Sequence, residues 1–279
     1  EFAGAQNTYG IEIVMPDGKA LQAATSHNLG DNFSKVFGIS FSDEKGKTKP
    51  VFQTSWGLST RSLAALIMVH GDDAGLVMPP LLAPIQVMIM AIGKADDPQF
   101  KEVVAASQAL AGELKNHGIL AEVNADQTQS LGYRINEQEV QGFPLRLEVG
   151  AKELDKGVIK FARRDTFEKG DIKKGEIVEE VRKLLEQIQA NLFEKSKKQQ
   201  AELTIAVRNY DEFKDVMAQN RRFIEVFWCE DSECEAKVKE ETKATPRVCE
   251  LKNLDQKADK KCFHCGKDAN REWLFAQSY

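Results

Sequence analysis

Residues 85–93, IQVMIMAIG, decide the fold class of the middle of the chain. Their apolar side chains are continuous rather than alternating, which predicts a strand buried on both faces of a sheet. The next segment, 100–118, has the apolar periodicity of an amphipathic helix and ends at a glycine. Three further strand-like segments follow, at 119–125, 143–150 and 158–165. This alternation predicts an α/β fold with a buried, mostly parallel or mixed sheet.

A long helix is predicted after the last of these strands. Residues 175–195 carry one apolar stripe at helical spacing, formed by Ile177, Val181, Leu184, Leu185, Ile188 and Leu192. The charged stretch 194–202 then leads into a third region, with a helix expected at 210–220 and a strand at 221–229.

The region before residue 85 is rich in strand-like segments. PDGK, at 16–19, is typical of a glycine-marked turn, and helices are expected at 28–38 and after Arg61. Two adjacent prolines in LVMPPLLAP, residues 76–84, force an extended backbone and mark a domain boundary. We therefore expect three domains, which cover residues 1–84, 85–193 and 194–279.

Residues 54–62, TSWGLSTRS, place a cation where a helix is expected to start. Ser59 or Thr60 is a suitable N-cap, so Arg61 falls in the first turn, at the positive end of the helix dipole. A cation there is unfavourable unless an anionic or aromatic group lies opposite it; the alternative is a solvated surface arginine. The residues that follow predict a buried helix face, formed by Leu63, Leu66, Ile67 and His70.

Four cysteines occur as two close pairs, one spaced C-x4-C and the other C-x2-C: Cys229 and Cys234, then Cys262 and Cys265. Two such pairs suit a tetrahedral four-thiolate zinc site, which is closed and therefore structural rather than catalytic. The alternatives are ordinary buried thiols, or a redox pair formed by the second two. His264 is expected to be a bystander and Cys249 a plain thiol.

The composition limits the possible partners. The chain has 279 residues and a net charge of −5, so contacts with nucleic acid must come from local basic patches. No apolar run reaches the roughly 20 residues needed to span a bilayer, so no membrane contact is expected. Five cysteines without a disulfide pattern, and no signal peptide, favour the reducing cytoplasm. The chain starts at Glu1 without methionine, which indicates a piece of a longer protein.

Several stretches, taken in order, resemble one family. Segments 2–5, 15–39, 53–89 and 142–166 are similar to prolyl-tRNA synthetases, with TSHNLGDNFSK and SWGLSTR as specific motifs. The late cysteine pairs and the ending LFAQSY resemble the eukaryotic/archaeal-type branch, which carries a C-terminal zinc-binding domain. Along essentially the whole chain, the resemblance implies an α/β and α+β multidomain fold. It would contain part of a class II antiparallel-sheet catalytic domain, an anticodon-binding domain with a mixed sheet and a small zinc-stapled domain.

The resemblance also implies which residues contact the substrates. GLSTR is similar to motif 3 of class II synthetases, whose arginine contacts ATP, so Arg61 is the expected catalytic residue. A guanidinium can stack on adenine and also pair with phosphate oxygens. The other matches are Gln22, Thr25 and Ser59 for ATP, and His27 and Trp56 for proline.

Each of these matches has a structural alternative. From the sequence alone, a polar strand face is the favoured explanation of Gln22 and Thr25. His27 is then a hydrogen-bonded structural histidine and Trp56 a core residue.

The implied reaction is the ATP- and Mg²⁺-dependent activation of L-proline to prolyl-adenylate, followed by transfer to tRNA(Pro) in protein biosynthesis. The complete enzyme would be a homodimer. Nothing in the chain resembles class II motifs 1 and 2, so we expect the 279 residues alone not to form prolyl-adenylate. The stretch 124–142 also departs from the family's usual anticodon-domain pattern. A non-catalytic tRNA-binding or regulatory protein derived from a synthetase is therefore the alternative function.

Overall fold

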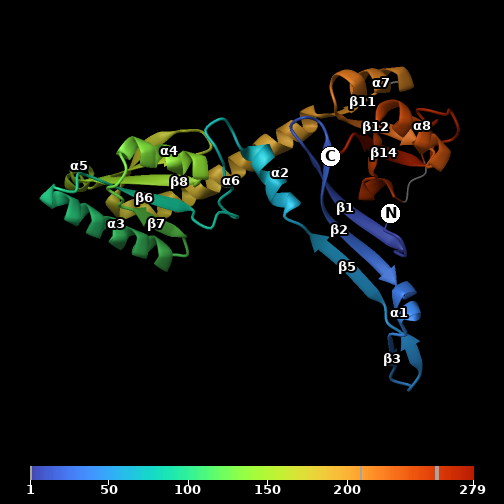
Figure 1. Ribbon diagram of the computed structural model, residues 1–279, viewed down its shortest axis with the longest axis horizontal. Coiled ribbons are helices and arrows are strands. Elements are labelled where there is room, and N and C mark those ends of the chain that lie inside the picture. The colour runs from blue at the N-terminus through green and yellow to red at the C-terminus, as the bar shows by residue number, and fades with distance from the viewer. Residues whose placement is uncertain (1, 208, 255–257) are drawn as a thin grey trace. The chain divides into compact units, whose positions relative to one another are not determined.

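The structure is a computed structural model that describes residues 2–207, 209–254 and 258–279. The chain forms two compact units, which Figure 1 shows as ribbons. Unit 1 combines Glu1–Val69 with Gln199–Tyr279, and unit 2 is His70–Lys198. The three-domain division stays a prediction.

Unit 2 is built on a five-stranded sheet in the order β10–β9–β8–β6–β7. β6 (Val87–Ile92) lies parallel between β7 and β8, whereas β9 and β10 are added antiparallel beyond β8. The predicted mixed α/β sheet is therefore confirmed. The other strands are β7 (Ala121–Asn124), β8 (Leu145–Gly150), β9 (Val158–Arg163) and β10 (Lys169–Lys173).

Helices cover both faces of this sheet. α3 (Pro98–Asn116) and α6 (Ile177–Glu202) share one apolar core with Val87, Ile89 and Ala91 of β6. α4 (Leu131–Gln141) lies on the other side of the strands, as Figure 1 shows. Because β6 is covered on both sides, its apolar residues run without alternation. The short α5 (Ala151–Asp155) follows β8.

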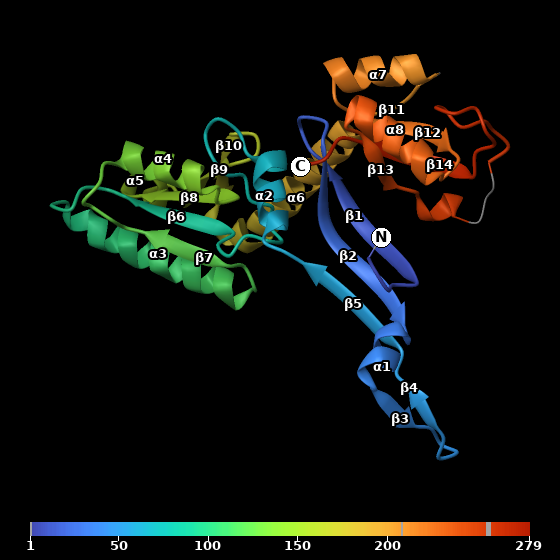
Figure 2. The same cartoon turned by 45° about the vertical axis from the view of Figure 1, so that its right-hand side comes forward.

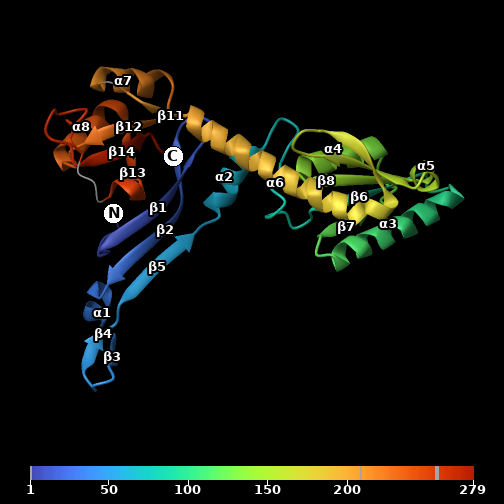
Figure 3. The same ribbon diagram turned by 180° about the vertical axis from the view of Figure 1, so that it is seen from behind.

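α6 confirms the predicted apolar stripe, because all six residues of the stripe are buried. The helix continues to Glu202, so the charged stretch 194–202 forms its last turns instead of a separate connection (Figure 3). Glu, Lys, Gln and Ala, which dominate this stretch, are good helix formers. In the described part of the chain, no helix is long and apolar enough to cross a membrane.

Unit 1 begins with an antiparallel sheet in the order β1–β2–β5, visible in Figure 2. Its strands are β1 (Asn7–Val14), β2 (Ala20–Gly30) and β5 (Gln53–Leu58). α1 and a small hairpin connect β2 to β5, with bounds α1 (Asn32–Phe37), β3 (Ser40–Ser42) and β4 (Thr48–Pro50). The helix predicted at 28–38 is shorter because residues 28 and 30 pair with β5 as part of β2.

α2 (Arg61–His70) forms as predicted, but its predicted buried face is wrong. Leu63 and Ile67 are 58% and 44% exposed. Ala65 is the buried residue, and it packs with Met15 and Leu21. Positions two residues from Ala65 lie about 200° around the helix, so packing Ala65 inward turns Leu63 and Ile67 outward.

The later part of unit 1 is a second sheet in the order β11–β12–β14–β13. The predicted helix at 210–220 and strand at 221–229 are confirmed as α7 and β12, which share a core rich in aromatic side chains. The bounds are β11 (Thr204–Ala206), α7 (Tyr210–Gln219), β12 (Phe223–Trp228), α8 (Ser232–Thr242), β13 (Thr245–Val248) and β14 (Arg271–Ala276).

The C-terminal residues pair with the start of β2. The Ala20 amide donates to the Gln277 carbonyl at 2.8 Å, and the Tyr279 amide donates to the Ala20 carbonyl at 3.3 Å. The predicted PDGK turn lies just before this contact, with Gly18 at a φ of +77°. A Cβ on Gly18 would lie 1.7 Å from the carbonyl oxygen of Arg221, so the two parts of unit 1 approach too closely here for any side chain.

We predict that Gly18→Ala destabilises unit 1 far more than Gly46→Ala. Both glycines have positive φ, but nothing lies within 4 Å of a Cβ on Gly46. Gly46→Ala should cost about 1 kcal/mol of left-handed strain. Gly18→Ala adds the overlap with a backbone carbonyl, for about 3 kcal/mol in total.

Urea unfolding followed by tryptophan fluorescence tests this, because all three tryptophans, at 56, 228 and 273, belong to unit 1. Equal losses in the two variants would contradict the close approach at Gly18.

Candidate functional site

A β-bulge places the predicted ATP and proline residues of β2 on one face. The register of β1 and β2 shifts at Ala23, which has no partner on β1. In a regular strand Gln22 and Thr25, three positions apart, would point to opposite faces. The extra residue reverses this, so Gln22 shares a face with Thr25 and with His27.

The Gln22 side chain extends along this face toward Thr25. Its Nε2 atom lies 3.8 Å from where a Cβ on Gly10 would be, and Gly10 is the β1 partner of Thr25. Gln22 is exposed and Thr25 half-buried. The bulge and the missing side chain at position 10 therefore bring an amide and a hydroxyl together.

His27 has the partners of a structural histidine. Its side chain is buried, with Nδ1 at 3.0 Å from the Thr8 Oγ1 atom. The Phe2 ring stacks on it with centroids 4.5 Å apart.

Trp56 is not brought together with His27. It pairs with Ser26 of β2, on the opposite face of the sheet, because neighbouring residues of a strand alternate. The indole is 80% exposed, so the alternative of a core tryptophan is wrong.

Arg61 begins α2 beside the bulge of β2. The Arg61 amide donates to the Ser59 hydroxyl at 3.3 Å, so Ser59 satisfies one of the free amides at the start of α2. The Ser62 hydroxyl donates to the carbonyl of Ala23, the bulge residue, at 3.1 Å. Within the described residues, no carboxylate forms an ion pair with the exposed Arg61 side chain. The start of α2, which carries this cation, is thus tied to the bulge that brings Gln22 and Thr25 to one face.

The two cysteine pairs converge into one cluster, defined here as Cys229, Cys234, Cys262 and Cys265. All four Sγ atoms lie within 4.8 Å of one another. The Cys229–Cys265 and Cys234–Cys262 sulfur separations are 3.6 and 3.8 Å. Tetrahedral zinc with Zn–S bonds of about 2.3 Å requires sulfurs about 3.8 Å apart. The arrangement therefore fits a four-thiolate zinc ion.

Local backbone structure orients these thiols. Asp231 caps α8 by accepting from the Cys234 amide at 3.1 Å, which fixes the start of the helix that carries this cysteine. Gly266, at a φ of +72°, closes the turn after the C-x2-C pair. Cys249 is not part of the cluster. His264 was expected to be a bystander, yet its Nδ1 atom lies 3.2 Å from the Cys234 sulfur.

The electrostatics of the cluster require a cation for full ionisation. Burial raises the pKa of Cys229 to about 11 and raises the pKa of Cys234 further. Burial also opposes ionisation of Cys262, but backbone N–H groups of Cys265 and His264 outweigh it and lower the pKa of Cys262. The backbone thus favours the thiolate of Cys262, whereas burial opposes the thiolates of Cys229 and Cys234, which a bound metal ion would stabilise.

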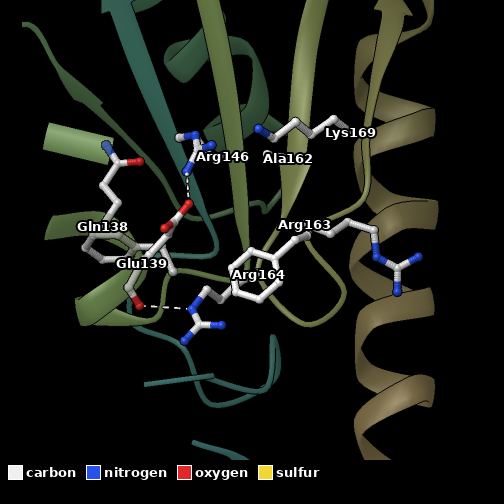
Figure 4. A pocket seen from close by; sticks show the side chains of 9 residues that line it. Gln138, Glu139, Arg146, Ala162, Arg163, Arg164 and Lys169 are labelled. Carbon is white, nitrogen blue, oxygen red and sulfur yellow. Dashed lines mark hydrogen bonds and ion pairs between the residues drawn. The ribbon is translucent and has the colours of Figure 1, made fainter. Parts of the chain in front are cut away.

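Unit 2 has a separate polar pocket at the ends of β8 and β9, beside α4 (Figure 4). Three arginines line it, and all three are buried: Arg146, Arg163 and Arg164. Charged side chains at strand ends are usually solvated, but these three are not. Each of the three guanidinium groups meets a carboxylate, which offsets the cost of its burial.

The carboxylates come from different elements. Arg146 contacts Glu139 of α4 at 3.2 Å and Glu148 of β8 at 3.0 Å. Arg163 binds Asp165 with two hydrogen bonds, of 3.0 and 2.8 Å. Together these pairs join the strand ends to α4 and to the loop after β9.

Arg164 donates two hydrogen bonds to Asp72, of 2.6 and 2.8 Å, and one to the Glu139 carbonyl. Among the described residues, the pocket groups left without a partner are the Lys169 ammonium and the Oε1 atom of Gln138. They offer one donor and one acceptor. Sequence reasoning did not single out Gln138 or Asp72, because chain spacing gives no signal for contacts this distant.

Comparison with known proteins covers both units. Residues 210–279 match the family model "Prolyl-tRNA synthetase, C-terminal", and residues 86–184 match "Anticodon binding domain". Across all of its length, the chain is 42% identical to a proline–tRNA ligase of Flavobacterium johnsoniae. It is 43% and 40% identical to proteins called proline–tRNA ligase 2 in Bacillus cereus and Clostridioides difficile. The chain spans 56–57% of the length of these curated relatives.

We predict a pH-dependent contribution from Asp72. Its hydrogen bonds to Arg164 lower the pKa of the Asp72 carboxyl. The pair therefore stabilises unit 2 above the unfolded-state pKa of about 3.9, and this contribution is lost as the pH falls through the lower folded-state pKa.

Asp72→Asn should cost about 2 kcal/mol at pH 7, because it leaves buried Arg164 without its carboxylate while Asp72 itself is partly exposed. The deficit relative to wild type should shrink below pH 4. Calorimetric unfolding of both proteins at pH 7 and pH 3 measures this difference in the free energy of unfolding. An equal difference at both pH values would contradict its assignment to the Asp72–Arg164 ion pair.

Proposed function

The chain belongs to the prolyl-tRNA synthetase family, and from this membership we propose that it serves the ATP-dependent attachment of L-proline to tRNA(Pro). The observation that carries the proposal is the identity of about 40% with proline–tRNA ligases along the whole chain. The grouping of Gln22, Thr25 and Arg61 around the bulge of β2 supports a nucleotide site in unit 1.

In this proposal unit 1 contains part of a class II catalytic domain. The proline carboxylate attacks the α-phosphate of ATP, pyrophosphate leaves, and the terminal ribose hydroxyl of tRNA then takes the prolyl group from the adenylate. Arg61 pairs with phosphate oxygens or stacks on adenine, while Gln22, Thr25 and Ser59 donate or accept hydrogen bonds. Such a site works by positioning and fixed charge, with ATP supplied together with Mg²⁺.

The proline site is the less supported part of the proposal. His27 lies on the face of Gln22 and Thr25, which favours a role beside them, although its Nδ1 atom already contacts Thr8. Trp56 remains a prediction without support from the strand register, because it faces the other side. The homodimer likewise stays a proposal from the family.

Unit 2 is proposed to bind the anticodon of tRNA(Pro). The match of residues 86–184 to an anticodon-binding domain supports this. The paired arginines of the pocket hold the strand ends in place, and the exposed Lys169 ammonium is left to contact RNA. A cation of this kind can pair with a phosphate or donate to a base edge in a single-stranded loop.

The cysteine cluster is proposed to hold one structural Zn²⁺, with Cys229, Cys234, Cys262 and Cys265 as ligands. Sulfur separations near the tetrahedral value support it. With four thiolates the ion stabilises the later part of unit 1 and takes no part in catalysis.

A non-catalytic tRNA-binding protein is the alternative, and Arg61 argues against it. A pure binding module needs no exposed, unpaired cation beside Gln22 and Thr25. Cysteine usage keeps the cytoplasm as the predicted location.

We predict that Arg61→Ala reduces the stabilisation of the chain by ATP. Ligand binding to the folded state stabilises it by an amount that grows with the logarithm of the ligand concentration divided by Kd, so weaker binding gives a smaller rise in melting temperature. Removing the guanidinium should weaken ATP at least tenfold, about 1.4 kcal/mol. Arg61→Lys should lose less, because an ammonium still pairs with phosphate but stacks poorly. Thermal unfolding with and without Mg-ATP measures this.

The matched control is Arg182→Ala, which removes an exposed arginine from α6 in unit 2. It should leave the ATP response at the wild-type value. An Arg61→Ala protein that ATP stabilises as strongly as wild type would contradict the proposed role of Arg61 and would favour the binding-module alternative.

We predict that Cys262→Ser lowers bound zinc from about one ion per chain to near zero. The sheet that carries the cluster should then unfold at lower temperature, because zinc-binding free energy is folding free energy in small domains. Metal analysis and the fluorescence of Trp228 and Trp273 measure both effects. Cys249→Ser, outside the cluster, is the control and should keep the zinc.

A further inference from the structure

One buried ion pair links the second sheet of unit 1 to the first. Arg247 of β13 contacts both carboxylate oxygens of Glu12 of β1, at 2.7 and 2.9 Å. The Glu12 side chain is only 5% exposed and that of Arg247 18% exposed. Water therefore cannot replace either partner, and the charge of Glu12 is balanced from the other sheet.

A bulge turns Arg247 toward β1. The pairing of β13 with β14 shifts between Pro246 and Val248, so Arg247 is the extra residue without a partner on β14. A bulge re-aims the side chain of the inserted residue and twists the strand. The local backbone of β13 is thus shaped to direct this guanidinium out of its own sheet.

Glu12 occupies a special position on β1. It is the direct cross-strand partner of Gln22, next to the bulge at Ala23. Directly opposed residues share a face, with Cβ atoms about 4.5–5.5 Å apart. Gly10 lies two residues along β1 on the same face, and the Gln22 Nε2 atom lies 3.8 Å from where a Cβ on Gly10 would be. The Gln22 side chain therefore starts opposite the Glu12 carboxylate and ends over Gly10.

We propose that Arg247 is a positioning residue for the nucleotide site of unit 1. Its guanidinium holds Glu12 in place and neutralises it, so that Gln22 keeps its orientation and no free anion lies beside the phosphates of ATP. The role rests on the proposed function, because it uses Gln22 as an ATP-contacting residue.

The pair has features of a positioning device more than of a stabilising one. Buried ion pairs often contribute little net stability compared with apolar residues of the same volume. Within the described chain the Nε atom of Arg247 has no partner, so its hydrogen bonding is incomplete. Removing only Arg247 leaves the buried Glu12 carboxylate without a partner. Removing both charges leaves no unpaired buried charge, so this cost disappears.

The test uses the full 279-residue chain with two readouts. Hydrogen–deuterium exchange of residues 10–14 and 20–25 reports the pairing of β1 and β2, and calorimetric titration reports the affinities for Mg-ATP and AMP. The variants are Arg247→Met and the double variant Glu12→Gln/Arg247→Met. The control is Arg271→Met, which removes a similar guanidinium–carboxylate pair, with Glu230, elsewhere in the second sheet.

In Arg247→Met we expect faster exchange in residues 20–25 and an affinity for ATP about tenfold weaker. The loss of affinity for AMP should be smaller than that for ATP, because AMP carries less negative charge near the Glu12 carboxylate. The double variant should recover most of both losses. The control should leave exchange in β1 and β2 unchanged. If Arg247→Met does not fold, Arg247→Lys replaces it, with the same direction and smaller effects.

Unchanged exchange in residues 20–25 overturns the positioning role. Faster exchange with unchanged ATP affinity also overturns it, and leaves Arg247 as a structural link while the proposed function stands. A wild-type chain that binds no ATP overturns the proposed nucleotide site, and this role with it. If the double variant binds ATP as weakly as Arg247→Met does, the proposal that Arg247 acts by neutralising Glu12 is overturned.

Discussion

The extra residue in β2 is the constraint on which the proposed site depends. β2 pairs with β1 on one side and β5 on the other, so its side chains must alternate between the two faces of the sheet. Ala23 breaks this alternation once and brings Gln22 to the face of Thr25. The same residue accepts the Ser62 hydroxyl and so fixes where α2 begins. One backbone irregularity thus sets both the strand side chains and the position of the helix that carries Arg61.

Arginines that form ion pairs with carboxylates hold the structure together, whereas an exposed arginine without such a partner is available to a ligand. Arg146, Arg163 and Arg164 are buried and paired with carboxylates, and Arg247 is paired across two sheets. Arg61 is exposed, without a carboxylate partner among the described residues. Arg134 is also buried, and it is held by neutral oxygens, those of Asn124 and the Ala91 carbonyl, instead of a carboxylate. An unpaired arginine beside uncharged hydrogen-bonding groups is therefore informative about function.

The later sheet of unit 1 connects the cysteine cluster to the strands of the first sheet. Cys229 directly follows β12, Cys234 lies in capped α8, and two cluster cysteines belong to the same core as Phe213 and Phe275. This sheet also provides Arg247 and the C-terminal residues that pair with Ala20. The cysteine cluster, the aromatic core and the strand pairing thus lie together in a unit whose two chain segments are about 130 residues apart in the sequence.

Local pattern was enough to determine much of this protein. The continuous run of β6, the apolar stripe of α6, the capped start of α2 and the two cysteine pairs follow from spacing and side-chain chemistry alone. Tertiary structure decided the face on which Gln22 and Trp56 lie, the exposure of Leu63 and the partners of every buried arginine. Bulges and ion pairs arise where distant segments meet, so a single sequence carries no local signal for them. Periodicity within an element can be read from the chain, whereas the register between elements depends on contacts that only the folded molecule contains.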